Sequence, residues 1–198
     1  MIPGRVGIVG YKTSIAKAFM SLRRGILYRS LRCNTQVHDL DAYLICCGYL
    51  AGKSLSEISH AEADETWHVN FLYPAELIEV LVAKNDHVRI CVIGSESGIS
   101  GSFDMAYAGA KAAMHLYIQT KQLRTPAQQL FGIAPHIIAD SGMTERRRDQ
   151  DRVKAAASRH RAARHISAME VAAVAADGLF GPSRFLSNAI IPLRGDKR

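Results

Sequence analysis

Three polar residues in the middle of the sequence have types and a spacing that suit acid–base chemistry. Tyr107 and Lys111 are four residues apart, so on a helix they share one face and the ammonium group can approach the phenol. A neighbouring cation lowers the pKa of a tyrosine toward the physiological range, where it can exchange a proton. Ser95 ends an apolar run and can hydrogen-bond a substrate carbonyl, and Ser97 is the alternative. The pattern indicates proton transfer at an oxygen of the substrate.

Apolar runs and amphipathic stretches alternate through most of the chain. Strands are expected at residues 5–10, 26–28, 41–48, 87–94, 132–138 and 188–193, and helices at 14–24, 62–84, 107–123, 145–165 and 168–179. This alternation predicts an α/β fold, a single Rossmann-type doubly wound domain over residues 1–198 with a mostly parallel sheet and helices on both faces. Ligands bind at the carboxyl ends of such strands, so we expect the site in the loops after Gly10, Gly48, Gly94 and Ile138.

The residues around Tyr107 closely resemble the short-chain dehydrogenase/reductase family. Ser95 precedes Tyr107 by twelve residues, Gly98 matches the glycine that follows the family serine, and Tyr107 and Lys111 match its Tyr-x-x-x-Lys pair. The resemblance implies hydride transfer between NAD(P)(H) and a carbonyl or alcohol substrate. Tyr107 would then exchange the proton, Lys111 would lower its pKa and hold the cofactor ribose, and Ser95 would orient the carbonyl.

Similarity to the family extends over nearly the whole chain. Asn70 matches the family asparagine, which bends its helix and holds a water that links the lysine to solvent. Thr144 corresponds to a residue that contacts the nicotinamide carboxamide or a cofactor phosphate, although Ala139-Asp140 replace the usual Pro-Gly. Residues 169–172 and 187–195 look like the closing helix and strand.

The cofactor end departs most from the family pattern. Of the glycine-rich motif only Gly10 remains, with Ser14 and Ala16 in place of the other two glycines. The helix amino end still offers N–H groups and a positive dipole to phosphate, and Ser14 and Thr13 add hydroxyl groups. The expected cofactor contacts are Gly10, Lys12, Thr13, Ser14, Ile15, Arg29, Gly48, Asn70, Tyr107, Lys111 and Thr144.

The region that binds the adenosine half of the cofactor is shortened. The chain is about 50 residues shorter than typical members, and the loss falls before Asp41. Arg29 and Arg32 stand where an acidic residue would hold the ribose 2′-hydroxyl of NAD. These arginines favour NADP(H) over NAD(H), and the alternative is that both are solvated surface residues.

Positive charge is concentrated in one segment. The net charge is +7, and residues 146–165 hold eight Lys or Arg against Asp149 and Asp151, a local excess of +6. The resemblance places a mobile substrate lid here, at about residues 145–165, so an acidic substrate could supply the missing counter-charge. The alternative is a solvated helical face. The segment lacks the aromatic residues that stack on bases, so nucleic acid is not an expected partner.

Composition and patterning limit the remaining classes. No apolar run approaches the ~20 residues that cross a bilayer, and no signal-peptide layout precedes the first strand, so no membrane contact and a cytoplasmic location are expected. The four cysteines show no metal-ligand spacing, and no metal is expected.

The resemblance also implies a homodimer or homotetramer. In the family the Asn-bearing and Tyr-bearing helices pair across a dyad, and here they carry the apolar residues Phe71, Leu72, Leu77, Ala113, Leu116 and Tyr117. The alternative to an oxidoreductase is a non-catalytic nucleotide-binding or scaffold protein on the same fold, which the degenerate glycine motif would suit.

Overall fold

The computed structural model describes residues 4–22, 26–31, 40–145, 150–158, 160–183 and 185–195. Within these residues, six parallel strands form one sheet in the order β2-β1-β3-β4-β5-β6. The strands are β1 (Arg5–Val9), β2 (Leu27–Leu31), β3 (Ala42–Ile45), β4 (Arg89–Ile93), β5 (Gln129–Pro135) and β6 (Ile190–Leu193). Strand order reverses between β1 and β3, which is the switch point of a doubly wound sheet.

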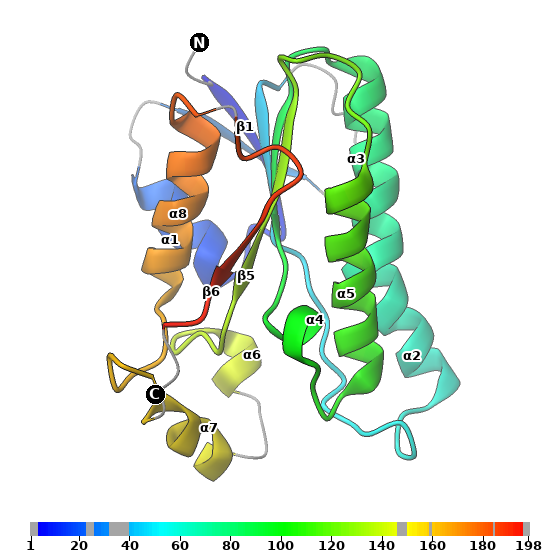
Figure 1. Ribbon diagram of the computed structural model, residues 1–198, viewed down its shortest axis with the longest axis vertical. Coiled ribbons are helices and arrows are strands. Elements are labelled where there is room, and N and C mark those ends of the chain that lie inside the picture. The colour runs from blue at the N-terminus through cyan, green and yellow to red at the C-terminus, as the bar shows by residue number, and fades with distance from the viewer. Residues whose placement is uncertain are drawn as a thin grey trace.

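Helices cover both faces of the sheet (Figure 1). One face carries α1 (Ser14–Leu22) and α8 (Ala168–Phe180). The other carries α5 (Met105–Thr120) and a continuous helical rod made of α2 (His60–Trp67), η1 (His68–Leu72) and α3 (Tyr73–Lys84). Three short helices lie at the carboxyl edge, α4 (Ser97–Ser100), α6 (Gly142–Glu145) and α7 (Gln150–Ala157). The predicted α/β fold is confirmed.

Alternating side chains of the strands supply two separate cores. Ile8, Leu44 and Phe131 pack toward α1 and α8, whereas Tyr43 and Leu130 pack on the other face with α3 and α5. Successive residues of a strand point to opposite faces, so strands buried on both sides read as continuous apolar runs. This is why the sequence pattern located them. None of the described helices is long and apolar enough to cross a bilayer.

The rod from His60 to Lys84 has two features that fix its ends and its course. Ser59 and Glu62 form a capping box, which starts the rod at His60. The turn from His68 to Leu72 is π-helical, and the Tyr73 N–H donates to the His68 carbonyl. Such turns are local expansions of an α-helix that occur frequently at functional sites.

The helix predicted for residues 145–165 is wrong in its second half. Within the described residues, α7 ends at Ala157, and residues 160–167 form an irregular segment. Ala163 adopts a positive φ of 51°, which a helix cannot contain. Ser167 then caps α8 through its own capping box with Glu170. The charge pattern alone did not reveal this break.

Candidate active site

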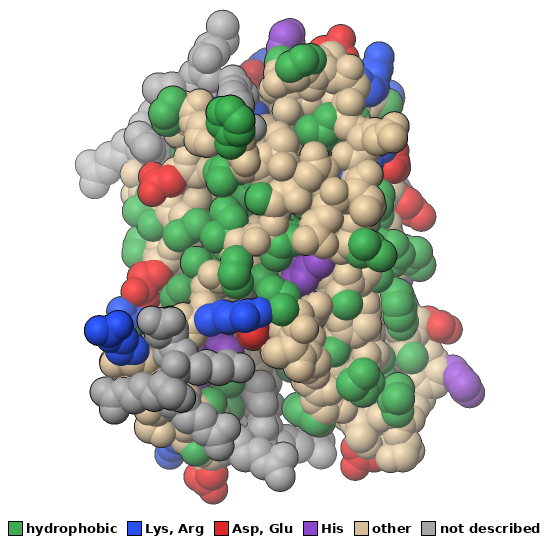
Figure 2. All heavy atoms as spheres, in the orientation of Figure 1, with side chains coloured by type: hydrophobic (Ala, Val, Ile, Leu, Met, Phe, Trp, Pro, Cys, Tyr) green, Lys and Arg blue, Asp and Glu red, His purple; other side chains and the backbone are tan. Residues whose placement is uncertain are grey.

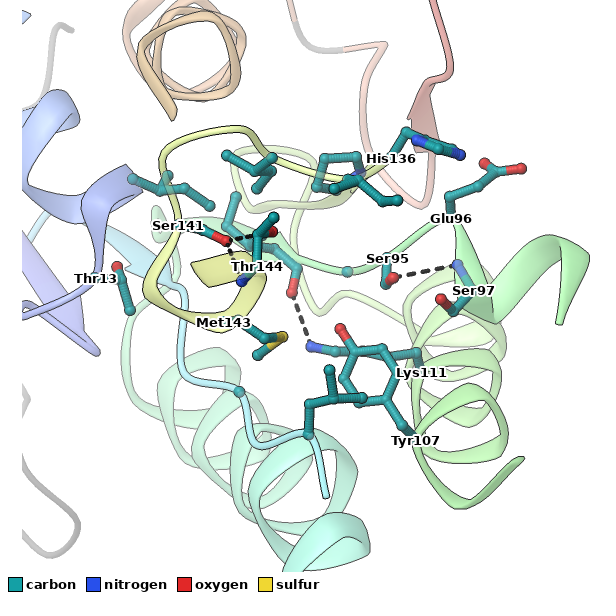
Figure 3. A pocket seen from close by; sticks show the side chains of 18 of the residues that line it. Thr13, Ser95, Glu96, Ser97, Tyr107, Lys111, His136, Ser141, Met143 and Thr144 are labelled. Atoms are coloured by element: carbon teal, nitrogen blue, oxygen red, sulfur yellow. Dashed lines mark hydrogen bonds between the residues drawn. The ribbon is translucent and has the colours of Figure 1, made fainter. Parts of the chain in front are cut away.

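A cavity of about 760 Å³ opens at the carboxyl edge of the sheet. Its walls come from the loops that follow β1, β3, β4 and β5, together with the start of α5 and residues 141–145 (Figure 3). The lining includes Lys12, Thr13, Ser14, Ile15, Gly48, Ser95, Ser97, Tyr107, Lys111, His136 and Thr144. The volume lies within the usual range of small-molecule sites, and four separate loops meet at the position that the topology dictates.

Tyr107 and Lys111 enter this cavity from the first two turns of α5. Asp104 fixes the start of the helix, because its Oδ1 accepts from the Tyr107 N–H at 3.0 Å. The other oxygen of this fully buried carboxylate accepts from the Gly52 N–H at 2.8 Å. The Lys111 ammonium donates to the Ile93 carbonyl at 3.2 Å and lies 5.8 Å from the centroid of the Tyr107 ring. A buried cap therefore sets the position of both side chains.

Burial dominates the electrostatics of this pair. It raises the pKa of Tyr107, against a hydrogen bond with Ser95 that lowers it, while Asp104 raises it further. Burial likewise lowers the pKa of Lys111, since the ammonium loses its water. We expected Lys111 to bring the pKa of Tyr107 down, and in this structure that pKa moves up instead. The largest cause of this rise is the cost of burying a phenolate, and Lys111 is not among the causes of the shift.

Ser95 is brought to Tyr107 by the loop between β4 and α4. Its hydroxyl accepts from the Ser97 N–H at 3.1 Å (Figure 3). Ser97 also lines the cavity, but of the two serines Ser95 is the one whose side chain lowers the pKa of Tyr107. The loop can lie this close because Gly98 faces α5: a Cβ there would be 2.8 Å from the Lys111 carbonyl carbon.

Asn70 lies behind the cavity wall, inside the π-helical turn. Its amide nitrogen donates to the carbonyls of Thr66 at 2.8 Å and Tyr49 at 2.7 Å, and its oxygen accepts from the Tyr49 N–H at 3.3 Å. Asn70 is thus the link between the rod and the loop after β3. A Cβ built on Gly48 would be 3.5 Å from the Asn70 oxygen and 4.0 Å from the Lys111 ammonium, so both side chains flank Gly48.

The residues expected at the phosphate end lie where β1 meets α1. Gly10 has a φ of +81°, and a Cβ there would approach the Cys47 nitrogen to 2.8 Å, so only glycine fits. Thr13 uses its hydroxyl internally, donating to Cys46 Sγ and accepting from the Ala16 N–H. Ser14 and Ile15 begin α1 and line the cavity.

Two further predicted cofactor contacts have different outcomes. Thr144 lines the cavity, with its hydroxyl oxygen accepting from Ser141 at 2.9 Å. Arg29 is exposed in the middle of β2, opposite Gly7, and is not part of the cavity wall. Arg29 lies two residues before the carboxyl end of β2, whereas the site lies beyond the carboxyl ends of the strands. Arg32 lies outside the described residues.

Sequence reasoning missed three residues that shape the site. Asp104 could have been found, because an aspartate three residues before Tyr107 is a typical helix N-cap. Buried Glu96 accepts from Arg194 Nε at 2.8 Å and connects α4 to the segment after β6. His115 accepts from the Ser95 N–H at 3.4 Å, and burial lowers its pKa to about 4. The partners of Glu96 and His115 are distant in sequence, so no local pattern marks them.

The sheet order and the cavity at its carboxyl edge define a doubly wound α/β protein with a small-molecule site at the switch point. Among solved structures, the chain has the fold of the short-chain dehydrogenases/reductases. An oxidoreductase of that family from Burkholderia thailandensis matches 98% of this chain and 92% of its own, with a TM-score of 0.83 and 15% identity. A short-chain dehydrogenase family protein from Francisella tularensis matches 97% of both chains, with a TM-score of 0.81 and 14% identity.

A third match is a Brucella melitensis protein described as short-chain dehydrogenase/reductase SDR:glucose/ribitol dehydrogenase, which covers 98% of both chains at a TM-score of 0.82 and 16% identity. No family model matches the sequence, and no curated protein matches it. The predicted resemblance is therefore confirmed at the level of the fold.

Proposed function

We propose that this protein is an NAD(P)(H)-dependent oxidoreductase of the short-chain dehydrogenase/reductase type, acting on a carbonyl or alcohol group. The observation that carries the proposal is the convergence of Ser95, Tyr107 and Lys111 in one cavity at the switch point. A protein that kept only the fold would have no need to keep a buried phenol, a buried amine and a hydroxyl group together, because burying each polar group is costly.

In this proposal Tyr107 is the acid–base group. Its raised pKa keeps the phenol protonated at neutral pH, which suits donation of the proton to a carbonyl oxygen. Ser95 orients that oxygen by donating a hydrogen bond to it from its hydroxyl. Lys111 stabilises the negative charge that is left on Tyr107 when it donates its proton, and Asn70 holds the wall of the cavity behind the ammonium group.

The described residues that line the cavity suit the binding of a dinucleotide. The amino end of α1 presents Ser14 and Ile15 to the cavity, where backbone N–H groups suit a phosphate, and Lys12 adds a positive charge. Gly10, Thr13, Gly48, Tyr107, Lys111 and Thr144 complete the proposed contacts. The nicotinamide would supply or accept the hydride. Our preference for NADP(H) over NAD(H) rests on Arg29 and Arg32, which follow α1. Because Arg29 does not line the cavity, only Arg32 still favours NADP(H).

The substrate class we propose is a small carbonyl or alcohol compound that carries an acidic group. Lys12 and Lys17 line the cavity, and the basic segment at residues 145–165 borders it through Glu145. Part of that segment is already neutralised, because Arg164 forms a two-fold contact with Glu170 at 2.7 and 2.8 Å. The lid function is therefore proposed for Arg146, Arg147 and Arg148, which lie outside the described residues.

Titration and turnover together test the proposal. NADPH and NADH are titrated into the protein and followed by nucleotide fluorescence, and a panel of aldehydes, ketones and alcohols is then assayed for nucleotide oxidation or reduction. We expect saturable binding of at least one nucleotide and turnover with some member of the panel. Absence of binding for both nucleotides would contradict the proposal.

A non-catalytic nucleotide-binding or scaffold protein is the second candidate. The engaged hydroxyl of Thr13 and the replacement of two motif glycines by Ser14 and Ala16 favour it. Tight nucleotide binding without turnover across a broad panel, by a protein whose Tyr107→Phe variant behaves identically, would establish this alternative instead.

A further inference from the structure

Three histidines converge at the carboxyl end of β5, apart from the Ser95–Tyr107–Lys111 group. His136 follows β5 and lines the cavity, while His160 and His165 come from the irregular segment between α7 and α8. Each offers one ring nitrogen, and these three nitrogens all lie within 4.8 Å of one another. His160 is buried and the other two are half-buried. Nothing in the proposed redox chemistry uses this cluster.

Two of the rings already stand at the spacing of metal ligands. His160 Nε2 and His136 Nδ1 are 3.1 Å apart. Two nitrogens bound to a tetrahedral zinc ion at ~2.05 Å are separated by roughly 3.3 Å. A cation between these nitrogens therefore needs only a small adjustment of either ring, and the third nitrogen needs a shift of roughly 1.5 Å to reach the same distance.

The protonation of His165 points to the same conclusion. Its Nε2 lies 2.7 Å from the Val153 carbonyl, which can only accept, so Nε2 carries the proton. Nδ1 is then the nitrogen with the lone pair, and it is buried with no hydrogen-bond partner. A histidine that donates its other N–H to a backbone carbonyl is the usual arrangement of a metal ligand, because the bond fixes both the tautomer and the ring.

Backbone contacts hold the segment in place without the metal. The Arg161 N–H donates to the Gly195 carbonyl at 3.2 Å, and the Ala139 N–H donates to the Ile166 carbonyl at 2.9 Å. Arg164, the cation next to His165, is paired with Glu170. The cluster is thus a preformed set of ligands, and the arginine beside His165 already has its counter-charge.

We propose that His136, His160 and His165 bind a divalent transition-metal ion, with zinc as the best match. Three imidazoles without a carboxylate favour zinc, copper or nickel over magnesium or calcium. Three protein ligands leave one position of a tetrahedral ion for water or for a ligand in the cavity that His136 lines. Binding needs the proton between His136 and His160 to move to the other nitrogen of its own ring, so that both facing nitrogens offer a lone pair to the ion. The ion would join residues 160–165 to β5.

The test uses the full chain, free of any histidine tag, treated with a chelator and dialysed. Zn²⁺ is titrated by calorimetry, and Co²⁺ is added separately because a tetrahedral cobalt site has characteristic visible absorption. We expect one ion per chain, the cobalt absorption, and a rise in Tm of roughly 5–10 °C at a free Zn²⁺ concentration 100-fold above Kd. None of these readouts depends on the oxidoreductase activity, so failure here leaves the proposed function untouched.

Two variants and a matched control locate the site. His160→Gln and His165→Gln should each weaken Zn²⁺ binding at least about 100-fold and abolish the cobalt absorption. His87→Gln removes an exposed histidine before β4, at the opposite end of the sheet, and should bind like the unaltered chain. Circular dichroism without metal checks that each variant folds. Lack of binding by the unaltered chain, or undiminished binding by a folded His165→Gln variant, would overturn the proposal.

Discussion

Tyr107 is held where its charged form is costly, and the side chain of Ser95 offsets part of that cost by lowering the pKa. The control for its role lies in the same helix. The Tyr117 hydroxyl points away from the cavity and donates to the Glu79 carboxylate at 2.7 Å. Tyr107 and Tyr117 thus lie on the same helix in different environments. Comparing variants of the two therefore separates proton transfer from general effects on α5.

Replacing Tyr107 with Phe removes only the exchangeable proton. We expect kcat/KM to fall about 10³-fold, within the range that general acid–base catalysis supplies, while nucleotide affinity changes by no more than about three-fold. Tyr117→Phe should retain nearly full activity. Steady-state kinetics and nucleotide titration measure both effects. Activity within a few-fold of the unaltered protein in Tyr107→Phe would remove the proposed mechanism.

His115 gives the protein a specific sensitivity to acid. Burial, aided by the neighbouring Lys111 charge, lowers its pKa from 6.5 to about 4. Between these values the unfolded chain binds a proton at this position and the folded chain does not, so the free energy of unfolding falls as pH drops from 6.5 to 4. The loss should be on the order of 2 kcal/mol.

The measurement is a series of urea unfolding curves between pH 7 and pH 4. His115→Gln should flatten the pH dependence across this window, whereas His87→Gln, at an exposed position, should leave it unchanged. Equal slopes for the unaltered chain and His115→Gln would show that other groups carry the acid sensitivity.

How far the site follows from sequence depends on where each contact partner lies. Tyr107 and Lys111 are four residues apart on one helix, and Ser95 ends a readable strand, so their meeting was predictable. The His136–His160 contact joins residues 24 apart, and a positive φ at Ala163 turns the chain between His160 and His165. No pattern in the sequence marks that turn, so the histidine cluster was not foreseen.

Among the elements, α4 and α5 make a close contact that bears on the site. A Cβ on Gly98 would lie 2.8 Å from the Lys111 carbonyl carbon and 2.9 Å from the Ala112 nitrogen. Both are backbone atoms of α5 and cannot rotate away. By contrast, a Cβ on Gly109 in α5 would meet only the Trp67 ring, at an ordinary 3.5 Å.

Gly98→Ala should therefore push α4 away from α5 and lower the free energy of unfolding by about 1–3 kcal/mol. Because the same loop carries Ser95, activity should fall as well. Gly109→Ala should be neutral or stabilise the protein by up to about 1 kcal/mol, since alanine is the better helix former. Urea unfolding of the two variants tests the pair. Equal stability of both would mean that the helices can separate without cost.

At the scale of the whole molecule, the sheet and its covering helices were the most predictable feature. Strands buried on both faces give continuous apolar runs, and helices give a 3.6-residue period, so their alternation indicates a parallel sheet. The π-helical turn at His68–Leu72 and the break after α7 were harder to foresee, because both depend on side chain–backbone contacts rather than on periodicity.

The basic segment makes a prediction about substrate recognition. Changing Arg146, Arg147 and Arg148 together to Gln should raise KM strongly for an acidic substrate, by an amount that shrinks as salt is added, with little change in stability. Arg124→Gln is the control, since Arg124 is exposed and lies just before the amino end of β5. An unchanged KM in the triple variant would leave these arginines as solvated surface charge.

Self-association is the last property that the surface predicts. Of the six apolar residues we assigned to the helix pair, Phe71, Leu77 and Tyr117 pack against the core, while Leu72 and Leu116 are 45% and 62% exposed. Figure 2 shows apolar side chains on both halves of this face, among them the half that α3 and α5 form. Exposed leucines on adjoining helices suit a two-fold interface, in which each copy presents the same patch to the other.

We therefore predict a homo-oligomer built through α5 and the rod. Leu116→Glu should shift the mass toward the monomer at micromolar concentration. A two-fold axis would bring the new carboxylates of both copies into the same apolar interface. Leu27→Glu is the matched control: Leu27 is 64% exposed, but it lies on the edge strand β2, away from α5. Sedimentation velocity measures all three proteins. A monomeric unaltered chain, or a Leu116→Glu variant that keeps the full oligomer mass, would rule out this interface.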